Sequence, residues 1–128
     1  MVSFIKKSFN KIKNYFKEHK KTQIITGFIG STEEGEITTL GRNGSDYTAT
    51  LFGTALNANS IEIWSDVDGV LSTNPNFTKE ARAIPYLTYE EAMELAHAGA
   101  EILFPPSIIP VLYKNIPVSY THLRAHET

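Results

Sequence analysis

The chain is short, lacks cysteine and is close to neutral in charge. Its 128 residues allow one domain or part of a larger one, and 41% hydrophobic with 20% charged residues is typical of a folded globular protein. The absence of cysteine excludes disulfides and thiolate metal sites, and no apolar run approaches the roughly 20 residues of a membrane span. Since the first residues also lack the apolar core of a secretory signal, we expect a soluble, cytoplasmic protein.

The basic residues are concentrated near the amino terminus. Seven of the twelve lysines and arginines lie within the first 21 positions, whereas residues 31–101 hold twelve of the fourteen acidic residues. A basic amphipathic segment is typical of a membrane-surface or nucleic-acid contact, or of a helix whose lysine face is solvated. We favour the solvated face, because nothing else in the chain indicates a polyanion partner, and we expect neither a membrane nor a nucleic-acid partner.

The first elements in chain order are a helix and two strands. Residues 3–20 are predicted to be helical, because four apolar side chains recur at helical spacing (Ile5, Phe9, Ile12, Phe16). The segment "TQIITGFIG" (22–30) is β-branched, apolar and short, which predicts a buried strand. After a polar turn, "ITTL" (37–40) predicts a short return strand.

The middle of the chain alternates between helical and extended patterns. Residues 45–58 carry a helical stripe of apolar side chains, and "SIEIWSDV" (60–67) predicts a second strand. Residues 88–99 give the clearest helix signal, in which Thr88 and Glu91 form a capping box and a glycine stands at the expected stop.

The end of the chain predicts two further strands, "EILF" (101–104) and "IPVS" (116–119), with a short helix over 107–114 between them. Alternating strands and helices predict an α/β fold with a largely parallel sheet. The last stretch, 119–128, breaks the pattern and resembles a foreign translated tail. Its two histidines have no carboxylate or cysteine partner in the sequence, so we expect no metal site there and exclude the stretch from functional interpretation.

The turn "GRNGSD" (41–46) between a strand and a helix is the first candidate site. Its two glycines allow backbone to approach a ligand, and the amides at the following helix start favour an anionic group. Arg42 offers a planar fork for a carboxylate or phosphate. A second interpretation stays open at this point, in which Ser45 and Asp46 merely cap the helix and the glycines make the turn.

The segment "SDVDG" (65–69), directly after a predicted strand, is the second candidate. Ligands of open α/β sheets bind where strands end and lead into helices. Two carboxylates and a glycine there are suited to a magnesium ion, a ribose or a phosphate. The spacing excludes a calcium loop, because Gly69 comes too early and Phe77 occupies the position of the closing glutamate. A plain polar turn is the alternative.

Three ordered blocks carry a resemblance to a known family: "TTLGRNGSDYTAT", then "IEIWSDVDGV", then "LTYEEAMELAHAGAEILFPPSIIPVLYKNIPV". Together they resemble the second half of an aspartate kinase catalytic domain, of the amino acid kinase superfamily. The "GRNGSD" form is most similar to the kinase part of bifunctional aspartokinase/homoserine dehydrogenases. The resemblance implies a three-layer α/β/α sandwich with a mostly parallel sheet. Residues 1–118 would be its carboxy-terminal, nucleotide-binding part.

The resemblance also implies a reaction and the residues that serve it. The γ-phosphoryl group of ATP, bound with Mg²⁺, passes to the side-chain carboxylate of L-aspartate, giving 4-phospho-L-aspartate. Arg42, with Gly44 and Ser45, would bind the substrate, and Asp46 would organise the site around the transferring phosphoryl group. The remaining predicted residues line the ATP pocket (Ser65, Asp66, Val67, Asp68, Gly69). We expect no dedicated protein metal site, and a homo-oligomeric parent enzyme.

The chain departs from the family pattern at several places. The amino-terminal "KFGG[TS]" turn, whose lysine stabilises phosphoryl charge, is absent from these residues. Leu71, Asn76, Glu101 and Phe104 replace the usual tyrosine, arginine, lysine and histidine of the nucleotide-binding blocks. We therefore expect little or no activity from the chain alone.

Three other interpretations stay open. The chain could belong to another amino acid kinase, acting on glutamate, acetylglutamate, carbamate or a nucleotide, although the glycine turn favours aspartate. It could be a non-catalytic nucleotide-binding or interaction module. It could also be a piece that does not fold stably, because half a sheet exposes an apolar edge and face.

Overall fold

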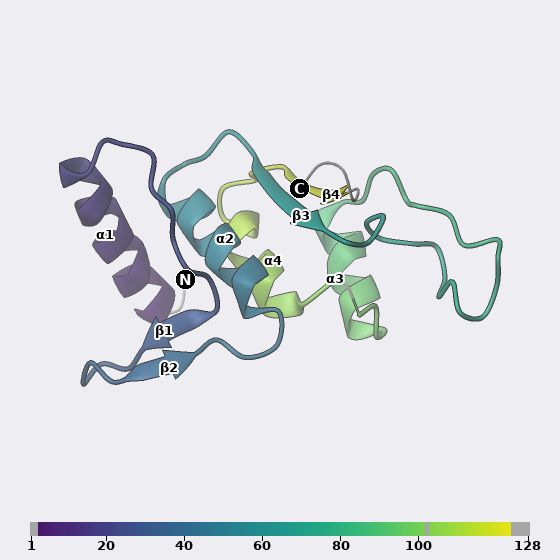
Figure 1. Cartoon of the computed structure of the whole chain (residues 1–128), viewed down its shortest axis with the longest axis horizontal. Coiled ribbons are helices and arrows are strands. Elements are labelled where there is room, and N and C mark those ends of the chain that lie inside the picture. The colour runs from purple at the N-terminus through teal and green to yellow at the C-terminus, as the bar shows by residue number, and fades with distance from the viewer. Residues whose placement is uncertain (1–2, 102, 124–128) are drawn as a thin grey trace.

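The computed structural model describes residues 3–101 and 103–123, in which helices alternate with short strands (Figure 1). The helices are α1 (Ser3–Glu18), α2 (Gly44–Ala55), α3 (Tyr89–His97) and α4 (Pro105–Leu112). The strands are β1 (Ile29–Ser31), β2 (Ile37–Thr39), β3 (Ile61–Ser65) and β4 (Val118–His122). This composition confirms the predicted α/β class.

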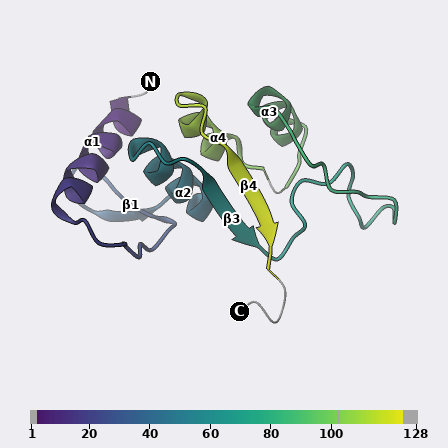
Figure 2. The ribbon, with the colours of Figure 1, turned by 90° about the horizontal axis from the view of Figure 1, so that it is seen from above.

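The strands β3 and β4 form a parallel pair, which Figure 2 shows from above. The pairing runs from Ile61 opposite Val118 to Ser65 opposite His122. A parallel pair needs a crossover connection, and here the crossover contains α3 and α4. The strands β1 and β2 form a separate antiparallel hairpin, with Ile29 opposite Thr39.

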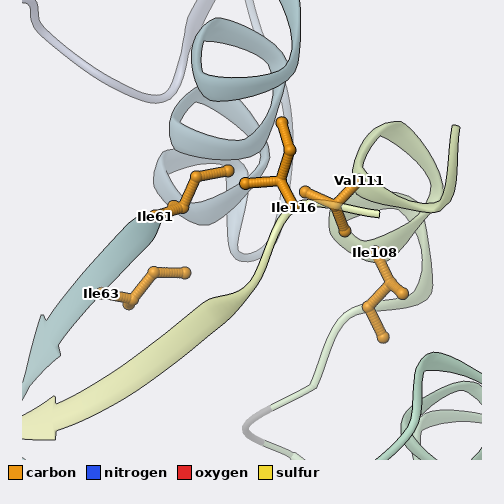
Figure 3. Packing of buried hydrophobic residues seen from close by; sticks show 5 residues of the cluster. All are labelled: Ile61, Ile63, Ile108, Val111 and Ile116. Carbon is orange, nitrogen blue, oxygen red and sulfur yellow. The ribbon is translucent and has the colours of Figure 1, made fainter. Parts of the chain in front are cut away.

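Burial alternates along β3, and this places the main core. Ile61 and Ile63 are buried, whereas Glu62 and Trp64 are exposed. The face with the isoleucines therefore meets the helices, and Figure 3 shows Ile61 and Ile63 pointing toward the α4 side chains. The buried cluster consists of Ile61, Ile63, Ile108, Val111 and Ile116. One side of α3 packs against it through half-buried side chains (Tyr89, Ala92, Met93, Ala96).

A second core joins α1 to α2. Ile5 and Phe9 of α1 are buried against Leu51 and Ala55 of α2, with Ile12 beside them. The lysines of α1 lie mostly on exposed positions, as expected for a helix with a solvated basic face. Figure 1 shows the result: α1 and the β1–β2 hairpin at one end, α2 and α4 in the middle, and a long loop at the other end.

The predicted helices are confirmed, with boundaries shifted by a few residues. The helix expected over 3–20 ends at Glu18, and the one expected over 107–114 spans Pro105–Leu112. The capping box at α3 is present, since Thr88 accepts from the Glu91 amide and the Glu91 carboxylate accepts from the Thr88 amide. The return strand near residue 37 and the strand near residue 61 are also confirmed.

The prediction of a buried strand over 22–30 is wrong. Only Ile29 and Gly30 of that segment lie in β1, and Ile24 and Ile25 are exposed. The local apolar pattern was correct for a strand, but a strand needs a neighbour for its backbone groups and a layer for its side chains. In the part of the chain that the structure describes, no strand pairs with residues 22–28.

The prediction of a strand over 101–104 is also wrong for the residues that are described. Leu103 is buried, but its amide donates to the carbonyl of Ala100 at 3.2 Å in a turn, and Phe104 is the N-cap of α4. Residue 102 lies outside the described residues. The predicted strand over 116–119 corresponds to β4, which begins at Val118 and continues to His122 within the stretch 119–128.

Candidate functional site

The glycine turn (residues 41–46) leads from β2 into α2. The amide of Gly44 donates to the carbonyl of Gly41 at 3.0 Å, which closes a tight turn, and Gly41 has a φ of 80° that favours glycine. Asn43 is the N-cap with a φ of 54°, and no side chain caps the helix. Capping by Ser45 or Asp46 therefore does not explain this turn.

The first turn of α2 presents backbone amides. The Gly44 amide donates to the Gly41 carbonyl within the turn, and the Tyr47 amide donates to the Asn43 carbonyl at 3.2 Å. The amides of Ser45 and Asp46 lie between these two, at a helix end where intrahelical carbonyl partners are lacking. Together with the positive end of the helix dipole, such amides favour a negatively charged group. Arg42 stands exposed in the same turn, where its guanidinium is available to a carboxylate.

Asp46 is the half-buried carboxyl group of the turn. Burial raises the pKa of Asp46 above its usual value of 3.8. Tyr120 of β4 is the partner of Ile63 in the β3–β4 pair. Burial first, and the charge of Asp46 second, raise the pKa of Tyr120 to about 12.

The strand-end segment (residues 65–69) begins at the last residue of β3. The Ser65 hydroxyl lies 3.4 Å from a carboxylate oxygen of Asp66, and Asp66, Val67 and Asp68 are all exposed. Gly69 is buried, with a φ of 93°, and a β-carbon placed on it would lie 3.8 Å from the Cβ of Tyr120. Gly69 thus adjoins Tyr120, which pairs with Ile63 in the middle of β3.

A cleft of about 920 Å³ opens beside the strand-end segment. Asp68 and Gly69 line it, together with the chain from Ile84 to Thr88 and the inner faces of α3 and α4. Its lining is mostly apolar, as in sites that receive a flat organic group. The other predicted nucleotide residues and the glycine turn do not line this cleft.

Two of the four positions that depart from the family pattern lie on a long loop between β3 and α3, called the excursion below. Leu71 bridges to Ala83, and the amide of Ser72 donates to the carbonyl of Arg82 at 2.8 Å, which closes the base of the excursion. Asn76 is exposed near its tip, where its amide donates to the Asn74 side chain at 2.9 Å. The other two positions precede α4: Glu101 is exposed and Phe104 is half-buried.

Asp68 also contacts the end of the chain. Its carboxylate lies 2.6 Å from Nδ1 of His122, with both side chains largely exposed. His122 belongs to the stretch 119–128, whose foreign origin stays a prediction. Among residues 3–101 and 103–123, no three histidine, aspartate or glutamate side chains gather into a group that could hold a metal ion.

Sequence reasoning missed the residues that pack against the glycine turn from the other side. Phe28 has a φ of 73°, its carbonyl accepts from the Leu40 amide at 2.8 Å, and its amide donates to the Thr48 hydroxyl at 3.1 Å. A β-carbon on Gly44 would lie 3.0 Å from the Phe28 ring. The one local signal is the glycine before Phe28, inside an otherwise apolar run.

Comparison with known proteins assigns the family. The amino acid kinase family matches residues 4–119. The chain belongs to this family.

The relatives are aspartokinases. The chain is 51% identical over 96 residues to aspartokinase 1, chloroplastic, of Arabidopsis thaliana, covering 74% of this chain and 17% of that protein. It is 46% identical over 97 residues to the bifunctional aspartokinase/homoserine dehydrogenase of Haemophilus influenzae, covering 76% of this chain and 12% of that protein. The chain therefore spans less than a fifth of either relative.

Solved structures of similar proteins support the same family assignment. Aspartokinase III of Escherichia coli, in complex with aspartate and ADP, superimposes with a TM-score of 0.78 at 38% identity, covering 88% of this chain and 25% of that one. Uridylate kinase of Archaeoglobus fulgidus superimposes with a TM-score of 0.54 at 21% identity, covering 73% of this chain and 41% of that one, which shows the shared fold alone. The resemblance to aspartate kinases is thus confirmed. No helix within the described residues is long and apolar enough to cross a membrane.

Proposed function

We propose that residues 1–118 are the carboxy-terminal, nucleotide-binding part of an aspartate kinase domain. The complete domain would transfer the γ-phosphoryl group of ATP to the side-chain carboxylate of L-aspartate. The observation that carries this proposal is the glycine turn, in which Arg42 is exposed, Gly44 is buried and no side chain caps α2. Similarity to an aspartokinase structure that contains aspartate and ADP supports it.

The glycine turn supplies the substrate side of the proposed site. Arg42 binds a carboxylate of L-aspartate through its guanidinium, and the Gly44 and Ser45 backbone lies close to the substrate. Gly44 is buried against Leu40 and Phe28, so the backbone of this turn is held in place before substrate arrives. Asp46 lies in the first turn of α2 and fixes the arrangement of groups around the transferring phosphoryl.

The strand-end segment supplies the nucleotide side. Ser65 to Gly69 form a wall for ATP, and the cleft beside Asp68 and Gly69 receives its apolar part. Phosphoryl transfer depends on positioning and charge neutralisation more than on a covalent catalyst. Mg²⁺ would supply that neutralisation when bound to the phosphates, beside the exposed carboxylates of Asp66 and Asp68.

The rest of the domain would come from sequence outside these 128 residues. The exposed face of β3, which carries Glu62 and Trp64, is where a second helix layer of the three-layer sandwich would pack. The lysine of the "KFGG[TS]" turn would also come from there. We therefore expect the chain alone to turn over ATP poorly or not at all, and its parent to be a homo-oligomer. A cytoplasmic location stays a prediction, since some relatives are named as chloroplast proteins.

A non-catalytic nucleotide-binding module is the second candidate. The replacements at Leu71, Asn76 and Glu101 favour it, because they remove polar or cationic groups expected near the phosphates. Asn76 is exposed, and its backbone amide donates to the side chain of Asn74. This hydrogen bond stabilises the local turn and does not direct the Asn76 side chain toward the strand-end segment.

The test joins this chain to the amino-terminal half of a related aspartokinase and assays the hybrid with ATP, Mg²⁺ and L-aspartate, trapping the acyl phosphate as a hydroxamate. Arg42→Ala should lower kcat/KM by roughly tenfold to a hundredfold, as expected for one charge-assisted contact. Arg82→Ala is the matched control, because Arg82 is exposed and lies on the excursion. A folded hybrid that binds ATP without turnover would support the non-catalytic module instead.

A further inference from the structure

One threonine hydroxyl joins the segment before β1 to the first turn of α2. The Thr48 hydroxyl accepts from the amide of Phe28 at 3.1 Å and donates to the carbonyl of Gly44 at 3.0 Å. A helical threonine often bonds to the carbonyl four residues earlier, and that bond alone concerns only its own helix. The Phe28 amide makes this hydroxyl a bridge between two segments of the chain.

Phe28 is held in a conformation that its side chain disfavours. Its φ of 73° lies in the left-handed region, which a β-carbon makes unfavourable. Such a conformation persists only where surrounding contacts determine it, and it is most frequent at functional sites. The amide of Phe28 donates to the Thr48 hydroxyl, and the carbonyl of Phe28 accepts from the Leu40 amide at 2.8 Å. Both backbone polar groups of Phe28 are therefore fixed.

The same contacts fix the glycine turn. A β-carbon on Gly44 would lie 2.9 Å from the Cβ of Leu40 and 3.0 Å from the Phe28 ring, so Gly44 sits between these two residues without room to shift. On the other side, Gly27 packs against Ser45. A movement of Phe28 would therefore displace Gly44, and with it the backbone of Ser45 and Asp46.

We propose that Thr48 is a positioning residue for the glycine turn. Its hydroxyl holds Phe28 against Gly44, and thereby holds Ser45 and Asp46 in the orientation that receives a carboxylate-bearing substrate. The consequence for substrate rests on the proposed function, whereas the bridge itself is a property of this chain. Thr48 acts through Phe28 and Gly44 and has no assigned contact with the reacting groups.

The first measurement is amide hydrogen exchange on the 128-residue chain. Thr48→Val keeps the shape of the side chain and removes both hydrogen bonds, and it should raise the exchange rate of the Phe28 amide by about tenfold. Thr48→Ser should restore slow exchange. Thr50→Val is the matched control, because the Thr50 hydroxyl donates to the Tyr47 carbonyl at 3.1 Å within α2. It should leave Phe28 exchange unchanged.

The second measurement uses the hybrid kinase. Thr48→Val should raise the KM for L-aspartate about tenfold while the KM for ATP stays within a factor of about two, and Thr48→Ser should rescue it. A purely structural role would lower the amount of folded enzyme and leave both KM values unchanged.

The outcomes separate this inference from the proposed function. Unchanged Phe28 exchange in Thr48→Val, or equal effects of Thr48→Val and Thr50→Val, would overturn the bridge. If the unaltered hybrid is folded but inactive, the proposed function fails while hydrogen exchange still decides the bridge. If the hybrid is active and Thr48→Val changes both KM values alike, the bridge does not position substrate.

Discussion

Gly27 packs directly against Ser45, because a β-carbon placed on Gly27 would lie 3.2 Å from the Cα and 3.3 Å from the Cβ of Ser45. A side chain at position 27 would therefore press against Ser45. It lets the segment before β1 come close to the start of α2, where the proposed substrate residues lie.

Gly27→Ala should consequently displace the first turn of α2. Contacts this short require a shift of a few tenths of an ångström, and we expect the hybrid kinase to lose roughly tenfold in kcat/KM for L-aspartate with a smaller loss in stability. Ser31→Ala serves as the control, because Ser31 is exposed at the end of β1. Hydroxamate assays at limiting aspartate would measure the difference. Equal activity of the two variants would contradict a packing role for Gly27.

Gly53 makes the tightest contact between α2 and the sheet. A β-carbon there would lie 2.4 Å from Cδ1 and 2.5 Å from Cγ1 of the buried Ile61. Alanine is favoured over glycine in a helix by about 1 kcal/mol, but overpacking costs roughly 1–3 kcal/mol, so Gly53→Ala should lower the unfolding free energy by about 1 kcal/mol.

Urea denaturation of a double-mutant cycle would test this clash. Ile61→Ala alone should lose roughly 2–5 kcal/mol, and less in the Gly53→Ala background, because the added methyl occupies part of the space. Strictly additive losses would show that Gly53 and Ile61 do not compete for the same volume.

The features that sequence predicts well are local ones. The capping box of Thr88 and Glu91 involves residues three apart, and it is present at the start of α3. Gly99 ends that helix region with a φ of 100°, as expected of a glycine stop. The alternation of Ile61 and Ile63 with polar neighbours also identifies a strand, because the period of two is encoded in the segment itself.

Pairing and packing between distant residues could not be predicted in the same way. The run around Ile24 has the composition of a buried strand, but its state depends on which strands lie beside it. For the candidate site, the glycine turn containing Arg42 was evident from residue types. The hydrogen bond from Phe28 to Thr48 spans 20 residues, and no pattern within either segment indicates it.

The capping box at α3 gives a stability prediction. Thr88→Ala removes the oxygen that accepts from the Glu91 amide at 3.1 Å, and the unfolding free energy should fall by about 1 kcal/mol. Thr88→Ser keeps this oxygen and should retain most of the stability. Chemical denaturation of the three proteins, compared at one pH, would measure both effects. A serine variant as unstable as the alanine variant would contradict a capping role.

The half-buried carboxyl of Asp46 predicts a pH dependence of stability. Burial raises the pKa of Asp46 in the folded chain above the usual value of 3.8. As pH rises, the unfolded chain therefore loses this proton first, and the unfolding free energy falls until pH passes the folded pKa. Asp46→Asn lacks this effect. The asparagine variant should gain stability relative to the native chain between acidic pH below 3.8 and neutral pH.

The same substitution should abolish most activity of the hybrid kinase, because Asp46 organises the proposed phosphoryl site. A gain in stability at neutral pH combined with a loss of activity is typical of a group kept for function at the expense of stability. Denaturation curves at a series of pH values would measure the first effect, with Asp66→Asn as the control because Asp66 is exposed. If Asp46→Asn and Asp66→Asn gave the same pH profile, the desolvation of Asp46 in the glycine turn would be excluded as its cause.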